Sequence, residues 1–282
     1  MPAERIVFAD GGTWELAVRT HVLGILNVTP DSFSDGGCFL DEGRASEHAA
    51  SMIAEGADGV DIGGQSTRPG SEPVTAQEER RRLVPVLARV RRENTRARIS
   101  VDTTRAAIAR EALDLGADMI NDISGMMVDP EMPATVARSG AACVLMHIRE
   151  TPRTMQDNPV YEDLIGEILR FLERAVERAV AAGVNPDGIA VDPGIGFGKT
   201  VEHNVEILRR LPEFRRLGRP ILVGVSRKSF IGALSGAPVE GRFAGSLGAG
   251  AVASLHGASI LRAHDVGGTV QMLRVVDALA RG

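Results

Sequence analysis

Short apolar runs alternate along the chain with stretches of helical periodicity, and each run ends in a polar side chain at a turn rich in Gly, Pro and Asp. The endings are Asn27, Asp61, Asp102, Asn121, His147, Asp192, Ser226 with Lys228, and Arg262 with His264. Apolar strands that alternate with helices predict a parallel sheet covered on both faces. Eight such units in 282 residues predict an α/β fold, a single (β/α)8 TIM barrel, a fold that usually takes about 250 residues.

The main alternative is a doubly wound open sheet, because the pattern does not show whether the sheet closes. Gly-Ala or Ala-Gly pairs introduce several of the apolar runs, among them GVDIGG at Gly59 and MINDISG at Met119, which indicates a repeated unit. In a closed barrel the carboxyl ends of all strands meet at one rim. The polar endings would then surround one pocket.

The clearest predicted helix runs from Tyr161 to Ala182, with apolar side chains on one face and charged ones on the other. Residues Arg5 to Val18, centred on Asp10-Gly11-Gly12, predict a β-hairpin before the first barrel strand. We expect this N-terminal extension, residues 1–20, to plug the barrel floor. Because no linker or low-complexity tract follows it, residues 1–282 are predicted to form one domain.

Composition excludes several functional classes. The bunched arginines at 80–82 and 89–92 fall on an amphipathic helix, and a net charge of -5 favours a solvated face over a nucleic-acid site. No apolar run approaches the roughly 20 residues that cross a bilayer, and the acidic first residues are unlike a secretory signal. Cys38 and Cys143 form no CxxC motif. These features predict a soluble, cytoplasmic protein that binds neither nucleic acid nor membrane.

Lysine is rare in this chain. Among 32 Lys and Arg residues only Lys199 and Lys228 are lysines, and both fall in loops at the predicted rim. A retained lysine indicates a need for a compact ammonium with rotatable donors. For Lys228 this favours a functional role, whereas Lys199 could equally cap a turn.

The glycine-rich segment at 192–199 matches no common phosphate-binding motif. A Walker A loop requires glycine where this chain has Pro193, and the spacing of its glycines is not GxGxxG. The six histidines show no zinc motif. A hard ion such as Mg²⁺, bound by a protein oxygen or two and by substrate phosphates, remains compatible with the Asn and Asp content.

Eight longer strings resemble the dihydropteroate synthase family of pterin-binding enzymes. They are LNVTPDSFSDGG from Leu26, DIGGQSTRPG from Asp61, VDTTR from Val101, NDISG from Asn121, TPRTMQDNP from Thr151, DPGIGFGK from Asp192, VGVSRKSFIG from Val223 and LRAHDV from Leu261. The resemblance runs from about Val22 to Val266. It implies condensation of 6-hydroxymethyl-7,8-dihydropterin diphosphate with 4-aminobenzoate to give 7,8-dihydropteroate and pyrophosphate, with Mg²⁺, in a homodimer that sulfonamides inhibit.

The resemblance also implies residue roles. The pterin would contact Asp102, Asn121, Met146, Asp192, Phe197 and Lys228. The diphosphate would contact Asn27, through Mg²⁺, together with Arg68, Arg262 and His264. The 4-aminobenzoate site would comprise Phe33, Thr67, Pro69, Phe197, Ser226 and Lys228, and the catalytic set Asp35, Arg68 and Lys228.

Physical chemistry supports these roles. A pterin presents adjacent N–H donors, for which a carboxylate in a dry pocket is a bidentate acceptor. Arg262 and His264, two apart on a strand, point to the same side and suit a phosphate clamp. The loops 29–37 and 65–71 have the composition of rim loops that close over a ligand. Taken singly, Asp102 or Asn121 could instead cap the helix that follows it.

Two other functions remain open. A non-catalytic or divergent pterin-binding relative would keep the pterin carboxylates, although corrinoid-linked methyltransferases would lack the SxRPG and SRKS segments found here. A phosphate-binding barrel isomerase or aldolase would place a catalytic Lys or Glu on a strand. The chain departs from the family at Gln65, where Glu is usual, and at Arg149-Glu150, where Gln-Gly is usual.

Overall fold

The computed structural model describes residues 5–29, 42–66, 70–94 and 96–281. Its main sheet has eight strands in the order β8-β7-β6-β5-β4-β3-β10-β9, and all of the strand pairs in it are parallel. The strands are β3 (His21–Asn27), β4 (Gly59–Gly63), β5 (Arg98–Asp102), β6 (Met119–Asp122), β7 (Ala142–Met146), β8 (Ile189–Asp192), β9 (Leu222–Val223) and β10 (Ile260–Ala263).

The sheet closes between β8 and β9. Val191 forms a parallel bridge with Ile221, and its amide donates to the carbonyl of Pro220 at 2.9 Å. This contact joins the two ends of the strand order, so the predicted barrel is confirmed and the open doubly wound sheet is wrong. Closure brings the carboxyl ends of β3 and β8 to the same rim, although 165 residues separate Asn27 from Asp192.

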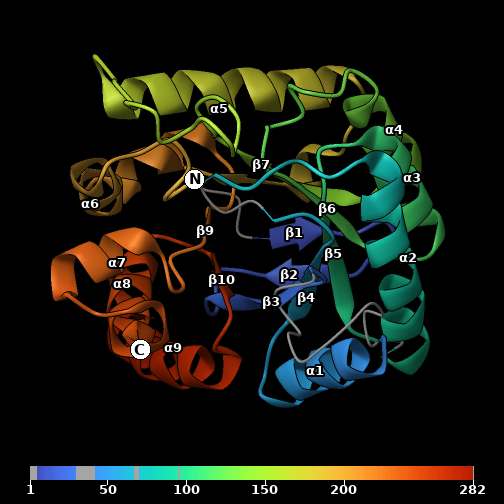
Figure 1. Cartoon of the computed structure of the whole chain (residues 1–282), viewed down its shortest axis with the longest axis horizontal. Helices are drawn as coiled ribbons and strands as arrows, with labels where there is room; N and C mark the ends of the chain where they lie inside the picture. Colours follow the sequence, from blue (N-terminus) through green and yellow to red (C-terminus); the bar gives the residue numbers. More distant parts are fainter. Residues whose placement is uncertain (1–4, 30–41, 67–69, 95, 282) are drawn as a thin grey trace.

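Helices surround the barrel (Figure 1). They are α1 (Glu42–Ala54), α2 (Ala76–Glu93), α3 (Ala106–Asp114), α4 (Met132–Ser139), α5 (Leu164–Ala181), α6 (Val201–Arg209), α7 (Ser229–Ser235), α8 (Phe243–Leu255) and α9 (Val266–Arg281), with 3-10 turns η2 (Pro186–Gly188), η3 (Leu211–Leu217) and η4 (Val239–Gly241). Among the described residues, no helix is long and apolar enough to span a membrane.

In six of the eight barrel strands, alternate residues serve two separate apolar cores, while β4 and β5 contribute only to the outer one. In β7, Cys143 and Leu145 pack outward against the helices, whereas Ala142 and Val144 belong to a second cluster inside the barrel. Because successive side chains of a strand point to opposite faces, a strand buried on both faces has no polar face. This explains why the strands are largely apolar between their ends, with Asp61 in the middle of β4 as an exception.

The N-terminal hairpin fills the barrel floor, as predicted. Its strands β1 (Arg5–Val7) and β2 (Thr13–Glu15) pair antiparallel, with Ile6 opposite Trp14. Four hairpin side chains, Ile6, Phe8, Trp14 and Leu16, are buried against the inward-facing residues near the amino ends of the strands. The Phe8 and Trp14 rings meet edge to face at 5.2 Å, a geometry that aromatic pairs favour.

Both predicted amphipathic helices form. Helix α5 buries the predicted apolar face but begins at Leu164 rather than Tyr161, because Asp163 accepts a hydrogen bond from the amide of Gly166 at 3.0 Å and caps the helix there. The arginines of α2 are a charged outer face, as predicted. Arg80 pairs with Glu111 and Arg89 with Glu93, while the opposite face of α2 is buried.

Replacing Trp14 should test the floor. Trp14→Ala removes a large buried ring whose cavity the barrel cannot fill, so we expect the free energy of unfolding to fall by about 3–5 kcal/mol. Urea denaturation measures this loss. Val18→Ala, at an exposed position of the same extension, is the control and should change stability by less than about 0.5 kcal/mol. Equal effects of the two changes would contradict a packed floor.

Candidate active site

The barrel rim gathers the predicted polar strand ends that the structure describes. Asn27, Asp102, Met146 and Asp192 are the last residues of their strands, while Asn121 and Arg262 are one residue from the ends of theirs. The carboxylates and the amide of Asn121 are buried, and Asn27 and Arg262 are half-buried. The rim is therefore a floor of polar groups that are buried or half-buried.

Arg262 occupies the centre of this floor. Its Nε donates to Asp61 Oδ2 at 2.6 Å and its Nη2 donates to Asp102 Oδ2 at 3.1 Å. Asn121 Nδ2 donates to the same Asp61 oxygen at 3.0 Å. The network thus joins Asn121 and Asp102, predicted to bind pterin, to Arg262, predicted to bind diphosphate.

Asp61 is the hub of the network, although the sequence assigned it no substrate. It is fully buried in the middle of β4, and its second oxygen, Oδ1, has no hydrogen-bond partner among the described residues. Its position among the polar strand endings was the only signal in the sequence. A buried carboxylate is costly without a partner, so Asp61 also fixes the place of the Arg262 guanidinium.

Burial shifts the acidity of the rim carboxyl groups. It raises the pKa of Asp102 to about 7, against the opposing effect of the Arg262 charge, and the neighbouring charge of Asp61 raises it further. Burial also raises the pKa of Asp192, while the charge of Lys228 and a hydrogen bond from Gly194 act in the opposite direction. In both carboxyl groups, burial thus favours the protonated form, and neighbouring cations and donors oppose it.

A tight turn sets the orientation of Asp192. The amide of Gly194 donates to Asp192 Oδ1 at 2.7 Å. Gly194 has a φ of +71°, and a Cβ built on it would lie 1.9 Å from the carbonyl oxygen of His147 at the end of β7. Only glycine fits there. The turn therefore packs closely against the end of β7, and its Gly194 amide holds one oxygen of the Asp192 carboxylate.

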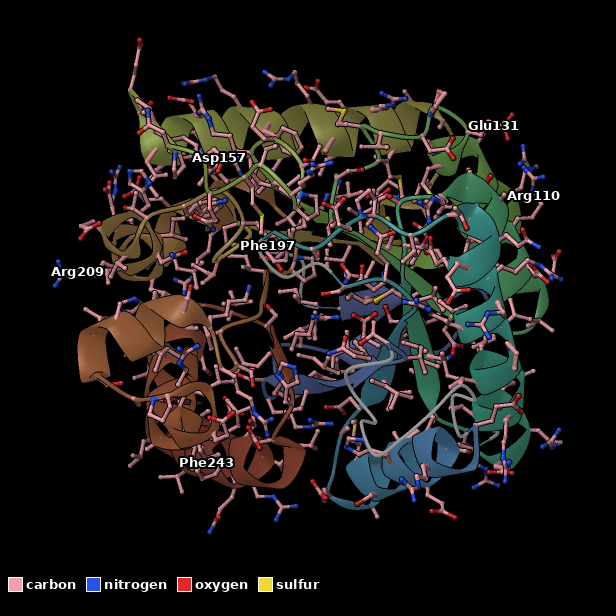
Figure 2. The ribbon with its side chains drawn as sticks, in the orientation of Figure 1. Arg110, Glu131, Asp157, Phe197, Arg209 and Phe243 are labelled. Carbon is pink, nitrogen blue, oxygen red and sulfur yellow. The ribbon has the colours of Figure 1, made fainter. Side chains whose placement is uncertain are left out.

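Lys228 lies across the pocket near this turn. Its Nζ donates to the carbonyl of Ile195 and stands 4.6 Å from the centre of the Phe197 ring. Burial lowers the pKa of Lys228 to about 8, with the charge of Asp192 raising it and that of Arg262 lowering it. Figure 2 shows Phe197 near the middle of the view, while Arg110 and Arg209 project from the periphery.

The turn after β9 directs two adjacent cations to different places. Arg227 adopts a left-handed φ of 58°, and its guanidinium pairs with Asp265 at 3.0 and 2.5 Å. The Arg227 amide donates to Ser246 Oγ of α8 at 2.9 Å. Because Arg227 is held against Asp265, the next residue, Lys228, faces Phe197. No feature of the sequence pointed to this role of Asp265, although the residue belongs to the LRAHDV motif.

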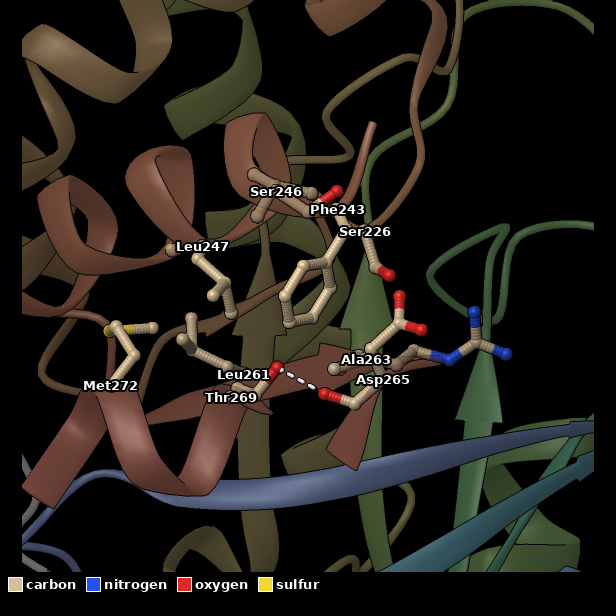
Figure 3. Close-up of a pocket in the computed structure, with 12 residues that line it drawn as sticks. Ser226, Phe243, Ser246, Leu247, Leu261, Ala263, Asp265, Thr269 and Met272 are labelled. Atoms are coloured by element: carbon tan, nitrogen blue, oxygen red, sulfur yellow. Dashed lines mark hydrogen bonds between the residues drawn. The ribbon is translucent and has the colours of Figure 1, made fainter. Parts of the chain in front are cut away.

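Ser226 and His264 meet on the other side of the pocket. Ser226 Oγ lies 3.0 Å from His264 Nδ1 and accepts from the His264 amide at 3.2 Å. A small hollow opens behind them, between β10 and helices α8 and α9, and Figure 3 shows its lining with Phe243, Leu247 and Met272. Ser226 and Arg262 also line this hollow, so it adjoins the polar rim.

Several predicted residues lie outside the described part of the chain. These are Phe33, Asp35, Thr67, Arg68 and Pro69. The structure describes only Thr29 of the predicted loop 29–37 and only residues 65, 66, 70 and 71 of the loop 65–71, so it does not place their contributions to the site.

No cluster of three or more His, Cys, Asp or Glu residues in the described ranges could hold a metal ion. A Mg²⁺ ion that takes most of its ligands from water and substrate phosphates needs only one or two protein oxygens. Asn27 offers such an oxygen, since its half-buried side chain ends β3 next to Gly63 and Asp102. The donor set fits a substrate-bound hard ion.

Comparison with known proteins decides the family. The pterin binding enzyme family matches residues 23–264, which include all eight barrel strands except the first two residues of β3. The chain belongs to this pterin-binding enzyme family. A dihydropteroate synthase of Synechocystis is 50% identical over 93% of this chain and 91% of its own length. The resemblance that the motifs indicated is confirmed.

Solved structures of pterin-binding enzymes share the whole fold. Yersinia pestis dihydropteroate synthase, solved with a sulfonamide drug complex, superposes with a TM-score of 0.92 at 42% identity and covers 99% of this chain and 100% of its own. The Xanthomonas albilineans dihydropteroate synthase, solved with 4-aminobenzoic acid, has a TM-score of 0.90 at 41% identity over 98% of both chains. These likenesses confirm the barrel throughout the chain.

One departure from the usual sequence of the family has an unusual backbone conformation. Glu150, where the family usually has Gly, keeps a left-handed φ of 62°. Its neighbour Arg149 lies 4.6 Å over the Tyr161 ring and pairs with Glu167 at 3.2 Å. These contacts hold the segment in the conformation that glycine would adopt freely. Gln65, the other departure, is half-buried.

The raised pKa of Asp102 predicts a pH effect on stability. Between the ordinary value of 3.8 and about 7, the folded protein holds a proton that the unfolded chain has released, so stability is lost as pH rises through that window. Asp102→Asn removes this dependence. Urea denaturation measures the unfolding free energy of both proteins at pH 5 and pH 8. We expect the difference, variant minus unaltered protein, to be larger at pH 8 than at pH 5. An equal difference at both pH values would refute the shift.

Proposed function

We propose that this protein is a dihydropteroate synthase. It joins 6-hydroxymethyl-7,8-dihydropterin diphosphate to 4-aminobenzoate and releases 7,8-dihydropteroate and pyrophosphate. The observation that carries this function is the arrangement of charges at the rim. A buried carboxylate, Asp192, and an ammonium, Lys228, lie near each other. Beside them is the ion-paired group formed by Asp61, Asp102 and Arg262. The family and its relatives support the same reaction.

The pterin lies on the polar floor. Asp192, ionised and bonded from below by Gly194, accepts the adjacent N–H donors of the pterin edge. Lys228 donates to the pterin carbonyl and ring nitrogen, while Asp102 and Asn121 bond other ring heteroatoms. Met146, buried at the end of β7, and Phe197 complete the contacts with the ring.

The diphosphate binds beside the pterin. Arg262 is anchored through Nε and Nη2, and its remaining nitrogen, Nη1, bonds no other described residue, so it is directed to the phosphate oxygens. Arg68 adds positive charge, and His264 adds a hydrogen-bond donor. Asn27 holds Mg²⁺, which neutralises diphosphate charge when it is bound.

The reaction breaks one bond and forms one. The bond between the pterin methylene carbon and the diphosphate oxygen breaks early, and the departing pyrophosphate keeps the electron pair. Arg262, His264 and Arg68 stabilise that negative charge, while the floor carboxylates temper the cationic methylene. The amine nitrogen of 4-aminobenzoate then bonds to the methylene carbon, and the N–H proton that it loses passes to the pyrophosphate or to solvent. A neutral amine has a free lone pair, so no base is needed to activate it.

The second substrate occupies the outer part of the pocket. Phe197, Ser226 and Lys228 bound it on the described side, and Phe33, Thr67 and Pro69 bound it from the two rim loops, where Asp35 and Arg68 join the closed state. The Nζ of Lys228 lies 4.6 Å from the centre of the Phe197 ring. An aromatic face and a cation are therefore close together, which suits a substrate with an aromatic ring and a carboxylate. Sulfonamides, which imitate that substrate, compete at this site.

The protein functions as a homodimer through α7, α8 and α9. Four of their apolar side chains, Leu234, Phe243, Leu255 and Leu279, are exposed, and α8 is rich in the Gly and Ala that allow close packing. Sedimentation equilibrium should return twice the mass of one chain, and Leu255→Glu should shift the protein toward that of a monomer. A monomeric unaltered protein would refute the proposal.

Catalysis and binding test the site assignments together. With dihydropterin diphosphate, 4-aminobenzoate and Mg²⁺, the unaltered protein should release pyrophosphate and form dihydropteroate, detected by chromatography. Lys228→Ala and Asp192→Asn should weaken binding of the pterin by at least about tenfold with or without its diphosphate, because a lost charge-assisted bond is worth about 1.5–3 kcal/mol. Arg262→Ala should mainly weaken binding of the diphosphate form.

The control is Arg110→Ala, which removes an exposed cation of α3 that pairs only at the surface with Glu131. It should leave product formation unchanged. Unaltered pterin affinity in Lys228→Ala would contradict its role. Tight pterin diphosphate binding without product would instead identify a non-catalytic relative.

A further inference from the structure

Lys199 is the second lysine of the chain and has no part in the proposed reaction. It follows the Asp192–Gly198 turn and is 3% exposed, so its side chain is closed off from solvent. Its Nζ lies 3.0 Å from His147 Nδ1 and donates to the Phe197 carbonyl at 2.9 Å. A buried lysine is rare unless its charge is paired or needed.

The lysine lies against the turn that orients Asp192. A Cβ built on Gly194 would be 3.4 Å from Lys199 Nζ, so the ammonium rests beside the glycine whose amide bonds Asp192. On its other side it reaches His147, whose amide donates to the Asp192 carbonyl at 3.0 Å. Lys199 therefore joins the end of β7, the Gly194 turn and the carbonyl of the aromatic residue Phe197.

We propose that Lys199 is a positioning residue for the pterin site, which clamps the Asp192–Gly198 turn from below and supplies a buried positive charge that keeps the Asp192 carboxylate ionised. This inference rests on the proposed function of Asp192 as the pterin acceptor. The sequence allowed Lys199 to cap a turn. That turn carries both Asp192 and Phe197, so capping it also affects ligand binding.

The electrostatic setting supports this role. The cations that act on Asp192 are Lys228, Lys199 and Arg262, and each opposes the effect of burial on its pKa. Burial and the charges of Lys228 and Arg149 lower the pKa of Lys199, while Asp192 raises it. Burial and the charge of Lys199 also lower the pKa of His147, so the imidazole is neutral and can accept from the lysine.

The test compares Lys199→Met and Lys199→Gln with Arg149→Gln. Arg149 is a neighbouring cation that is 38% exposed, acts on Lys199 and His147, and is not among the charges that act on Asp192. For each protein, affinity for 6-hydroxymethyl-7,8-dihydropterin diphosphate is measured by calorimetry from pH 5 to 9. Thermal unfolding in the same buffers separates folding from binding.

Loss of the Lys199 charge should raise the pKa of Asp192 further. Pterin binding needs the ionised carboxylate, so affinity falls at low pH as Asp192 takes up a proton. This acid limb of the affinity profile should move to higher pH in Lys199→Met and Lys199→Gln. A shift of about one unit would weaken binding about tenfold below the pKa. Arg149→Gln should keep the limb in place. Lys199→Gln retains a donor, so it reports on the charge even where Lys199→Met folds poorly.

An acid limb at the same pH in a folded Lys199→Gln protein would overturn the role of the charge and with it this proposal. Unaltered protein that fails to bind the pterin diphosphate would instead overturn the proposed function and this inference together. A limb that moves equally in Arg149→Gln would also count against Lys199, because the effect would then be a general response to lost positive charge.

Discussion

The pairing of buried charges at the mouth of the barrel is the constraint on which the site depends. Three carboxylates, Asp102 and Asp192 at strand ends and Asp61 in the middle of β4, have almost no contact with solvent. Charges buried in this way are costly unless cations and donors compensate them. Arg262 bridges Asp61 and Asp102, and the two lysines act on Asp192. The result is a polar pocket of fixed geometry.

This arrangement suits a reaction that separates charge. The departing pyrophosphate carries negative charge and the pterin methylene carries positive charge, so the dihydropteroate synthase reaction is best served by opposed, preorganised groups rather than by a proton shuttle. Arg262 lies between the two halves of the site, since two of its nitrogens contact carboxylates of the pterin floor. The proposed pterin and diphosphate sites therefore share one guanidinium.

The barrel below supplies the rigidity that such a site requires. The apolar strands are covered by helices outside and by the hairpin cluster inside, so the strand ends cannot shift independently. Two turns then direct individual side chains, one at Gly194 under Asp192 and one at Arg227 beside Lys228. In both, a left-handed residue turns the backbone at the point where a functional side chain must face the pocket.

Sequence alone determined the repeating strand-helix pattern, the hairpin and most of the polar rim, because burial on both faces makes a strand apolar and leaves polarity to its end. It also identified the family, since the motifs are long. It did not determine closure, which depends on one bridge between Val191 and Ile221. Nor did it show that Asp61 is the hub, or that Lys199 lies beneath Asp192. Those facts depend on contacts between distant strands, which only the folded chain brings together.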